Sequence, residues 1–513
     1  MRLNTLLVTF NDIYVLKTIF LIRYLKNRMK NMSNKLKDFF DATSFCVIGA
    51  STNPLKPGGV VAENFARKFP GKLYLVNPKG GEHELAGKKY PLYKSILDIE
   101  DSIDVAIIIV PAKYAPKALE ECGKKAIRKV IITTGGFSEI GVEGQKIQEE
   151  MLEIMNEYRI NVIGPNCLGL YAPKLGYDTM FLPESKLKRP KSGKVSIFTQ
   201  SGAFGAAFID QLYRLGSGNW VSKFISYGNA SDINEADCID YLGSDEETKM
   251  IIFYLEDFKN GRKFIEKARE VSLKKPIMGI KANRTEIGAK AGASHTAALS
   301  SDEVIVADIL KEAGFIRVIS WGELEDCVLA FGTQPLPAGD RVAIVTDGGG
   351  AGVMASDMVS DCNLKLAKFS EETQKKLDES FPVFYATENP IDVTGSATAE
   401  DYRVALEAVY SDPNVDSVVN LCLPCIPNLN INEYIQITKE FSQRKEKPFL
   451  TALIGGNEAI WGTEELLKED VPCFDSPGRA VRAVGLLTQY AKFLERHNVN
   501  QSPFESTIGE DYE

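Results

Sequence analysis

The sequence predicts an α/β protein built from three parallel-sheet domains. From Ser44 onward, short runs rich in β-branched residues alternate with segments of helical periodicity. Parallel neighbouring strands need a crossover connection, and the helical segments supply one after each strand. Two Pro- and Gly-containing segments without periodicity, 173–193 and 333–339, divide this alternation into three sets. A chain of 513 residues is long enough for about three separate cores.

The first set occupies residues 41–172. We expect its strands, identified by their β-branched content, at 45–48, 73–76, 105–110, 130–133 and 162–163. The segments with helical spacing are 60–69, 115–124 and 143–158. This repetition of strand and helix predicts a doubly wound parallel sheet.

The second set occupies residues 190–330 and the third residues 339–490. In the second we expect strands at 195–199, 224–226, 250–254 and 276–280, with helices after Ser201, through 236–242 and after Gly261. In the third we expect strands at 342–346, 417–421 and 449–453. Residues 496–513 read as a polar tail.

Residues 1–40 read as an N-terminal extension. The apolar stretch 6–25 is interrupted by polar and charged residues, so it is too broken to cross a bilayer. Its basic cluster follows the apolar stretch instead of preceding it, which argues against a secretory signal. A basic amphipathic helix on a membrane surface, an added terminal helix and an overlong start remain open, and Met32 looks like the more natural beginning.

Composition excludes several classes of protein. With 44% hydrophobic and 25% charged residues, the chain is neither disordered nor fibrous. The formal net charge of −9 argues against a chain that binds nucleic acid. Nine scattered cysteines, an odd number, indicate reduced thiols and a cytoplasmic location.

A turn in the first set has the features of a phosphate-binding loop. The strand at 45–48 runs into Gly49, Ala50 and Ser51, and Lys56 follows before a helix. This order places backbone N–H groups, a hydroxyl and a lysine at the carboxyl edge of the sheet. A generic βα turn is the alternative. The chain lacks the G-x-G-x-x-G fingerprint, and Asn77 follows the second strand where an acidic residue would be expected, so a nicotinamide cofactor is disfavoured.

Two turns of the second set could bind an anion in the same way. The strand at 195–199 ends in Gln200, Ser201 and Gly202, at the start of a helix. The turn 227–232 follows the next strand. Because the carboxyl ends of parallel strands meet at one edge, the two turns could converge on a single phosphate.

His295 is the strongest candidate for catalysis. It is one of three histidines and lies in a run of Gly, Ala and Ser residues, 288–298, that a ligand could approach closely. Such an imidazole could accept a phosphoryl group, although a histidine packed into a loop is the alternative. Glu256, after the strand at 250–254, could hold the other imidazole nitrogen. We expect no protein-held metal, because the pair Cys422 and Cys425 has no second pair or nearby histidine.

Seven motifs occur in the order found in a known family. They are Gly49-Ala50-Ser51 with Lys56 and Gly58, 76–80, 134–139, 164–169, 200–202, 254–256 and 294–296. Together they resemble the α subunit of the ADP-forming (NDP-forming) acyl-CoA synthetases, typified by acetate–CoA ligase and related to succinyl-CoA synthetase. The resemblance covers about 44–490. It implies a Rossmann-like CoA-binding domain followed by two flavodoxin-like domains.

The resemblance also implies roles for individual residues. The residues that would border the CoA phosphates and adenosine are Gly49, Ser51, Lys56, Asn77 and Pro111. His295 would be the histidine that becomes phosphorylated, and Glu256 the glutamate that steadies it. The residues that would face the phosphate and the acyl group are Asn166, Gln200, Ser201 and Gly202.

The family's ATP-grasp module has no counterpart in this sequence. The resemblance therefore implies a separate β subunit that binds ATP or ADP and Mg²⁺, in an α2β2 assembly. CoA, phosphate and a small carboxylic acid of undetermined identity would be the other ligands. A non-catalytic CoA-binding regulatory or scaffold protein of the same fold is the alternative, and the presence of both His295 and Glu256 counts against it.

Overall fold

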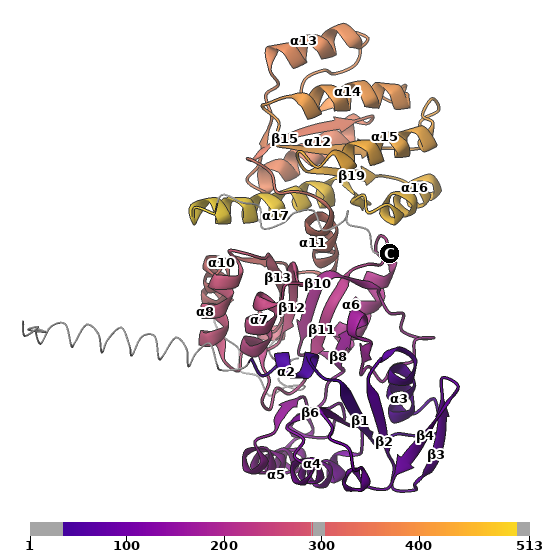
Figure 1. The fold of residues 1–513 in the computed structure, drawn as a ribbon. Helices are drawn as coiled ribbons and strands as arrows, with labels where there is room; N and C mark the ends of the chain where they lie inside the picture. The colour runs from indigo at the N-terminus through magenta and orange to yellow at the C-terminus, as the bar shows by residue number, and fades with distance from the viewer. Residues whose placement is uncertain (1–33, 289, 291–302, 500–513) are drawn as a thin grey trace, which may run out of the picture.

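The computed structural model of this chain describes residues 34–288, 290 and 303–499. Its three β-sheets follow one another along the length of the molecule, from the first sheet in indigo to the third in orange (Figure 1). The expectations for 1–33, for His295 and for 500–513 lie outside the described residues.

The first sheet is mostly parallel. Its strand order is β3-β4-β2-β1-β5-β6-β7. The strands are β1 (Ser44–Ile48), β2 (Lys72–Val76), β3 (Gly81–Leu85), β4 (Lys88–Tyr93), β5 (Val105–Ile108), β6 (Lys129–Ile132) and β7 (Asn161–Ile163). The crossover helices are α3 (Pro57–Lys68), α4 (Ala115–Lys124) and α5 (Val142–Tyr158). The antiparallel hairpin of β3 and β4 extends the sheet and was not among the predicted strands.

The second sheet has the order β14-β13-β12-β10-β11-β8-β9. Its strands are β8 (Gly169–Ala172), β9 (Tyr177–Asp178), β10 (Ser192–Thr199), β11 (Val221–Ser226), β12 (Met250–Leu255), β13 (Ile277–Lys281) and β14 (Phe315–Arg317). Its described helices are α6 (Gly202–Arg214), α7 (Glu235–Ser244), α8 (Gly261–Val271), α10 (Glu303–Glu312) and α11 (Trp321–Thr333). Because β8 pairs antiparallel with β11, residues before the expected connection 173–193 already belong to this sheet.

The third sheet has the order β16-β15-β18-β19-β20, with β17 beside β15. The strands are β15 (Arg341–Thr346), β16 (Lys365–Leu366), β17 (Ile391–Asp392), β18 (Ser417–Cys422), β19 (Phe449–Leu453) and β20 (Cys473–Phe474). The helices are α12 (Gly349–Asp361), α13 (Glu371–Ser380), α14 (Ala399–Ser411), α15 (Ile431–Arg444), α16 (Asn457–Lys468) and α17 (Pro477–Arg496). All its strand pairs are parallel.

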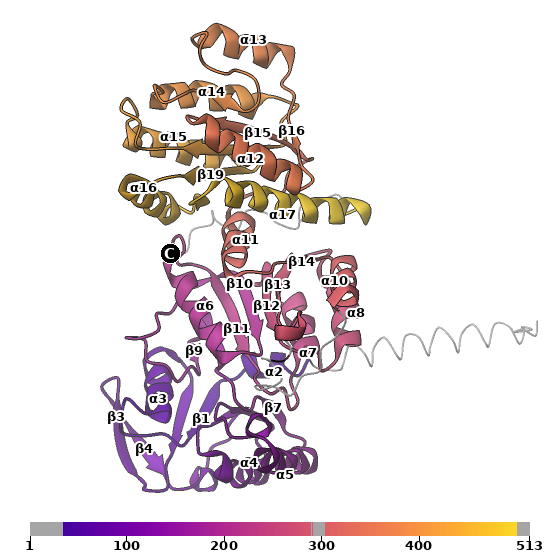
Figure 2. The same cartoon turned by 180° about the vertical axis from the view of Figure 1, so that it is seen from behind.

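The three sheets share apolar cores. One core cluster joins the first sheet to the second and includes Phe39 and Phe40 of the short helix α2 (Lys37–Phe40). Another joins the second sheet to the third, where α11 and α17 lie between them (Figure 2). The Tyr490 hydroxyl of α17 donates to the Ser272 carbonyl at 2.8 Å. The third sheet is therefore packed against the second and not merely tethered to it.

None of the described helices is long and apolar enough to cross a membrane. All nine cysteines lie in the described ranges and are free thiols. Within the same ranges, no group of three or more His, Cys, Asp and Glu side chains is arranged to hold a metal ion.

Candidate active site

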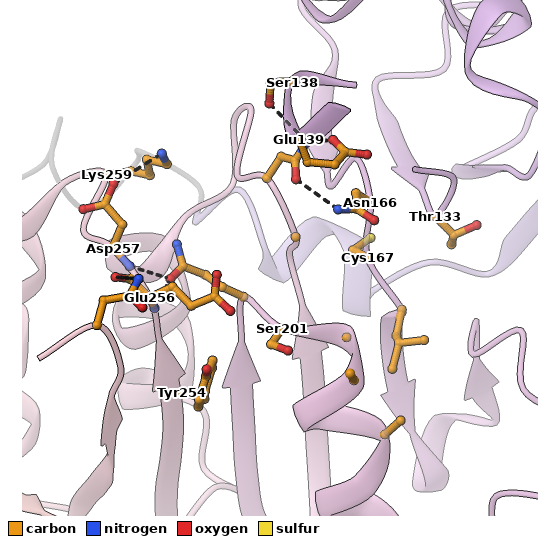
Figure 3. A pocket seen from close by; sticks show the side chains of 18 of the residues that line it. Thr133, Ser138, Glu139, Asn166, Cys167, Ser201, Tyr254, Glu256, Asp257 and Lys259 are labelled. Carbon is orange, nitrogen blue, oxygen red and sulfur yellow. Dashed lines mark hydrogen bonds and ion pairs between the residues drawn. The ribbon is translucent and has the colours of Figure 1, made fainter. Parts of the chain in front are cut away.

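A pocket of about 830 Å³ opens where the carboxyl edges of the first and second sheets face each other. Residues that follow β6, β7, β10, β11, β12 and β13 line it, as expected for a site at the carboxyl ends of parallel strands. In Figure 3, Ser201 lies between Glu256 on one side and Asn166 on the other. The predicted residues that line the pocket are Asn166, Gln200, Ser201, Gly202 and Glu256.

The N-terminus of α6 opens into this pocket. The Ser201 hydroxyl caps the helix by accepting the Phe204 N–H at 3.2 Å. Gly202 and Ala203 head the helix, where backbone donors have no partner within the helix, and both residues line the pocket. A helix N-terminus carries partial positive charge, so this end of the pocket suits an anion.

Gln200 ties two adjacent strands together. Its side-chain oxygen accepts the N–H of Glu256 at 2.5 Å and the N–H of Asp257 at 3.0 Å. The Glu256 carbonyl in turn accepts the buried Lys281 ammonium at 2.9 Å. Burial lowers the pKa of Lys281. These contacts fix the backbone of Glu256 at the edge of the pocket.

Asn166 and Glu139 meet on the opposite side of the pocket through Asn229. The Asn166 amide donates to Asn229 Oδ1 at 3.3 Å, and the Asn229 amide donates to Glu139 Oε2 at 2.7 Å. Burial acts to raise the pKa of Glu139, but hydrogen bonds from Asn229 and the Gly136 N–H outweigh it, so the pKa is lowered. Glu139 is therefore held as a carboxylate that links the first sheet to the second.

The turn that carries Asn229 approaches the loop after β7 closely. Gly228 has a φ of +53°, and a Cβ there would lie 2.2 Å from the Pro165 carbonyl oxygen. The Asn229 N–H donates to that same carbonyl at 3.0 Å. Only glycine fits this contact, which brings the two turns to one side of the pocket.

Apart from His295, which lies outside the described residues, the other predicted residues gather at the carboxyl edge of the first sheet. Gly49 follows β1 with a φ of +97°, and a Cβ there would lie 2.3 Å from the Ile109 carbonyl oxygen. The Asn77 amide donates to the Ala50 carbonyl at 2.6 Å. Pro111 begins the turn after β5, and Lys56 is exposed before α3. These residues and Ser51 do not line the 830 Å³ pocket, so the predicted residues form two neighbouring groups.

Sequence reasoning missed several residues of the pocket. Glu139 and Asn229 lie in turns that the sequence singled out, but no pattern showed that their side chains meet. Asp257 and Lys259 follow Glu256 directly and had no separate signal. The apolar residues Phe181 and Leu182 come from the segment expected to be a featureless connection.

Three family models match consecutive parts of the chain. A CoA binding domain matches residues 43–173, a succinyl-CoA ligase like flavodoxin domain residues 192–331, and a Ligase-CoA domain residues 342–496. Together they cover most of the described structure and correspond in order to its three sheets.

Relatives of known activity match the chain over most of its length. The α subunit of acetate–CoA ligase [ADP-forming] I from Pyrococcus furiosus is 37% identical, over 90% of this chain and 99% of that protein. The 4-hydroxybutyrate–CoA ligase [ADP-forming] from Nitrosopumilus maritimus is 34% identical, over 88% of this chain but only 64% of its own length. A solved structure of dinucleotide forming acetyl-coenzyme A synthetase 1 from Ca. Korarchaeum cryptofilum, in complex with phosphate and ADP, has a TM-score of 0.83 at 31% identity, over 91% of this chain and 99% of that one.

Proposed function

Because this chain belongs to the family of ADP-forming acetate–CoA ligase α subunits, we propose that it interconverts acyl-CoA, ADP and phosphate with a carboxylic acid, CoA and ATP. The observation that carries the proposal is the pocket between the first two sheets. There the α6 N-terminus, Asn166 and Glu256 face one cavity, as an enzyme that handles a phosphoryl group requires.

His295 is the proposed phosphoryl acceptor. It lies outside the described residues, and Gly288, which lines the pocket, precedes it by seven positions. Seven residues span at most roughly 25 Å, so the chain length permits His295 to reach the cavity. Glu256 would accept a hydrogen bond from one imidazole nitrogen, which leaves the other unprotonated and nucleophilic.

The proposed reaction has three transfers. First, a phosphate oxygen bonds to the thioester carbonyl carbon, the C–S bond breaks and CoA leaves as the thiolate. Next, an imidazole nitrogen of His295 bonds to phosphorus, and the bond from phosphorus to the acyl oxygen breaks to release the carboxylate. Finally, a terminal oxygen of ADP bonds to phosphorus, the P–N bond breaks and ATP forms.

The residues of this chain would lower the barrier mainly by holding negative charge. The N–H groups of Gly202 and Ala203, with the Asn166 amide, would bind the phosphoryl oxygens through the first two transfers. Glu256 would stabilise the positive charge on the phosphorylated ring. Apart from the nucleophile His295, the chain would thus supply positioning and electrostatics around the reacting groups.

CoA would bind at the carboxyl edge of the first sheet. Gly49 lets the backbone turn tightly there, Lys56 is exposed and able to pair with a phosphate, and Ser51, Asn77 and Pro111 border the same edge. This group of residues fits an anionic, extended ligand.

ATP, ADP and Mg²⁺ would bind an ATP-grasp β subunit in an α2β2 assembly in the cytoplasm. Residues 41–172, 190–330 and 339–490 would be the three domains.

Phosphorylation of the chain tests the proposal. The purified chain is incubated with γ-³²P-ATP and Mg²⁺, with and without its ATP-grasp partner, as wild type and as His295→Asn. We expect acid-labile, base-stable label on the wild type only, and only with the partner present. Label retained on His295→Asn would overturn the histidine assignment. Absence of label with an active partner would favour a non-catalytic CoA-binding protein.

A further inference from the structure

Lys259 is the only cation among the described residues that line the pocket. The carboxylates of Glu139, Glu256 and Asp257 line the same pocket. Lys259 Nζ lies 3.6 Å from Asp257 Oδ2, and 43% of the Lys259 side chain is exposed, so this ion pair is weak (Figure 3). Three carboxylates would repel a phosphoryl group. The Lys259 ammonium is the described group that can offset this repulsion.

The two residues beside Lys259 are both held by helices of the second sheet. The Phe258 ring packs against the Phe264 ring of α8, with 5.6 Å between the ring centroids. The Asn260 N–H donates to Glu235 Oε1 of α7 at 2.6 Å. Because the chain is fixed immediately before and after Lys259, the direction of this lysine depends on both contacts.

Gln200 and Glu235 hold opposite ends of the segment 256–260. Gln200 accepts the first two N–H groups of this segment, at 2.5 and 3.0 Å. Glu235 accepts the last N–H group, that of Asn260. Two side chains from separate elements therefore fix one charged segment at the edge of the pocket.

The stability of the fold does not explain the Glu235 carboxyl. The residue is fully buried, and its Oε2 has no hydrogen-bond partner among the described residues. Burial raises the pKa of this carboxyl, against the opposite effect of hydrogen bonds from the Asn260 and Lys259 N–H groups. Burying a carboxyl with one unpaired oxygen costs free energy. Its contact with Asn260 therefore points to a role at the pocket.

We propose that Glu235 is a positioning residue that holds Lys259 at the pocket, where the Lys259 ammonium pairs with the oxygens of the phosphoryl group. The proposal rests on the proposed function, because it needs a phosphoryl group in the pocket. It deepens that function by adding a cation to the backbone N–H groups of α6. Glu235 is not among the lining residues, so it acts through the backbone of Asn260.

The rate of phosphorylation tests the role of Lys259. Single-turnover labelling from γ-³²P-ATP is measured with the ATP-grasp partner present. Lys259→Met should slow labelling by roughly tenfold or more, because one charged contact to the phosphoryl group is lost. Lys263→Met is the matched control, since Lys263 also pairs with a carboxylate, is 41% exposed and does not line the pocket. Its labelling rate should stay within about twofold of the wild type.

Variants of Glu235 test the positioning. Glu235→Ala should slow labelling by a similar factor, because the chain after Lys259 loses its anchor. Glu235→Gln keeps an acceptor oxygen and resembles the protonated carboxyl, so its rate should lie within roughly threefold of the wild type. The double variant Glu235→Ala with Lys259→Met should match Lys259→Met alone, because Glu235 acts through the lysine that it positions.

Hydrogen exchange in the free chain supplies a readout that needs no activity. Glu235→Ala should speed exchange of the Asn260 amide by roughly tenfold or more. Ser272→Ala is the control for stability, since it removes a buried hydrogen bond to the Ala313 carbonyl at the other end of α8. This substitution should lower the melting temperature and leave both the Asn260 exchange and the labelling rate unchanged.

The outcomes separate this proposal from the proposed function. Circular dichroism verifies that each variant is folded, and Lys259→Met changes an exposed side chain, so it remains testable if Glu235→Ala does not fold. Equal labelling of Lys259→Met and Lys263→Met, or unchanged Asn260 exchange in Glu235→Ala, would overturn the proposal. If the wild-type chain takes no label with an active partner while the Asn260 exchange responds to Glu235→Ala, the proposed function fails instead.

Discussion

The side-chain oxygen of Gln200 accepts the backbone N–H of Glu256 at 2.5 Å, so the residue that follows β10 holds the residue that follows β12. The two strands are parallel neighbours, and their ends would otherwise diverge into separate loops. The same oxygen also accepts the Asp257 N–H. Gln200 thus fixes the backbone of Glu256, the residue proposed to orient His295.

Replacing Gln200 by Ala should slow phosphorylation of the chain by roughly ten- to a hundredfold. The change leaves two part-buried N–H groups without their acceptor, which costs about 1–3 kcal/mol of stability for each unsatisfied group. The end of β12 would also lose its fixed position. Single-turnover labelling from ATP measures the effect. Gln145→Ala, on the exposed surface of α5, is the control and should match the wild type. A wild-type rate for Gln200→Ala would show that Glu256 is held by other contacts.

Arg189→Met should lower the free energy of unfolding by about 3–5 kcal/mol, because it leaves the Asp178 carboxylate buried without a partner. The double variant Arg189→Met with Asp178→Asn should recover part of that loss. Arg67→Met is the comparison, since its pair with Glu63 is exposed and should be worth less than about 1 kcal/mol. Urea denaturation measures the free energy of unfolding of all three variants. Equal losses for Arg189→Met and Arg67→Met would contradict the role given to burial.

Asp347 should make the stability of the protein fall as the pH rises from about 4 to 6. Burial raises the pKa of this carboxyl to about 6, against the contrary effect of the hydrogen bond from the Leu423 N–H. Between these pH values the unfolded state has lost the proton that the folded state keeps, so unfolding becomes easier with increasing pH. Asp347→Asn keeps the acceptor for Leu423 and should remove this dependence.

The melting temperatures at pH 5 and pH 8 measure the Asp347 effect. The melting temperature of Asp347→Asn minus that of the wild type should be larger at pH 8 than at pH 5. Asp361→Asn is the control, because the Asp361 carboxylate is exposed at the end of α12, in the same domain. This substitution should leave the wild-type pH dependence intact. Identical pH profiles for the wild type and Asp347→Asn would refute the prediction.

Lys56→Ala should weaken CoA binding by about tenfold, the loss expected for one charged hydrogen bond to a phosphate. The effect should shrink at high salt, because Lys56 is exposed. Isothermal titration calorimetry with CoA measures the dissociation constant. Lys88→Ala, exposed on β4, is the control and should bind CoA like the wild type. Equal affinities for the two variants would place the CoA phosphates elsewhere.

The sequence predicts the buried parallel strands well and the sheet edges poorly. The expected helix at 115–124 coincides with α4, and the expected strand at 449–453 with β19. Such elements carry their own apolar pattern. The hairpin of β3 and β4 is short and rich in charge, so its pairing depends on β2 beside it and not on periodicity.

For the pocket, the sequence indicates which turns meet but not which side chains touch. Gln200 and Glu256 are both predicted site residues, because each follows a buried strand. The contact from Asn229 to Glu139 joins residues 90 positions apart, and it exists only because Gly228 lets its turn approach the loop after β7. Phe181 and Leu182 lie in a segment without periodicity, where the Arg189 guanidinium donates to the Leu182 carbonyl at 2.8 Å.

Helix α17 has a consequence for how the protein is made. It completes the core shared by the second and third sheets, and its Tyr490 bonds to Ser272, 218 positions earlier. A ribosome that adds roughly 5–20 residues per second takes on the order of ten seconds to pass from α11 to α17. During that interval the nascent second sheet keeps an apolar flank in contact with water, and this flank is covered only when α17 emerges.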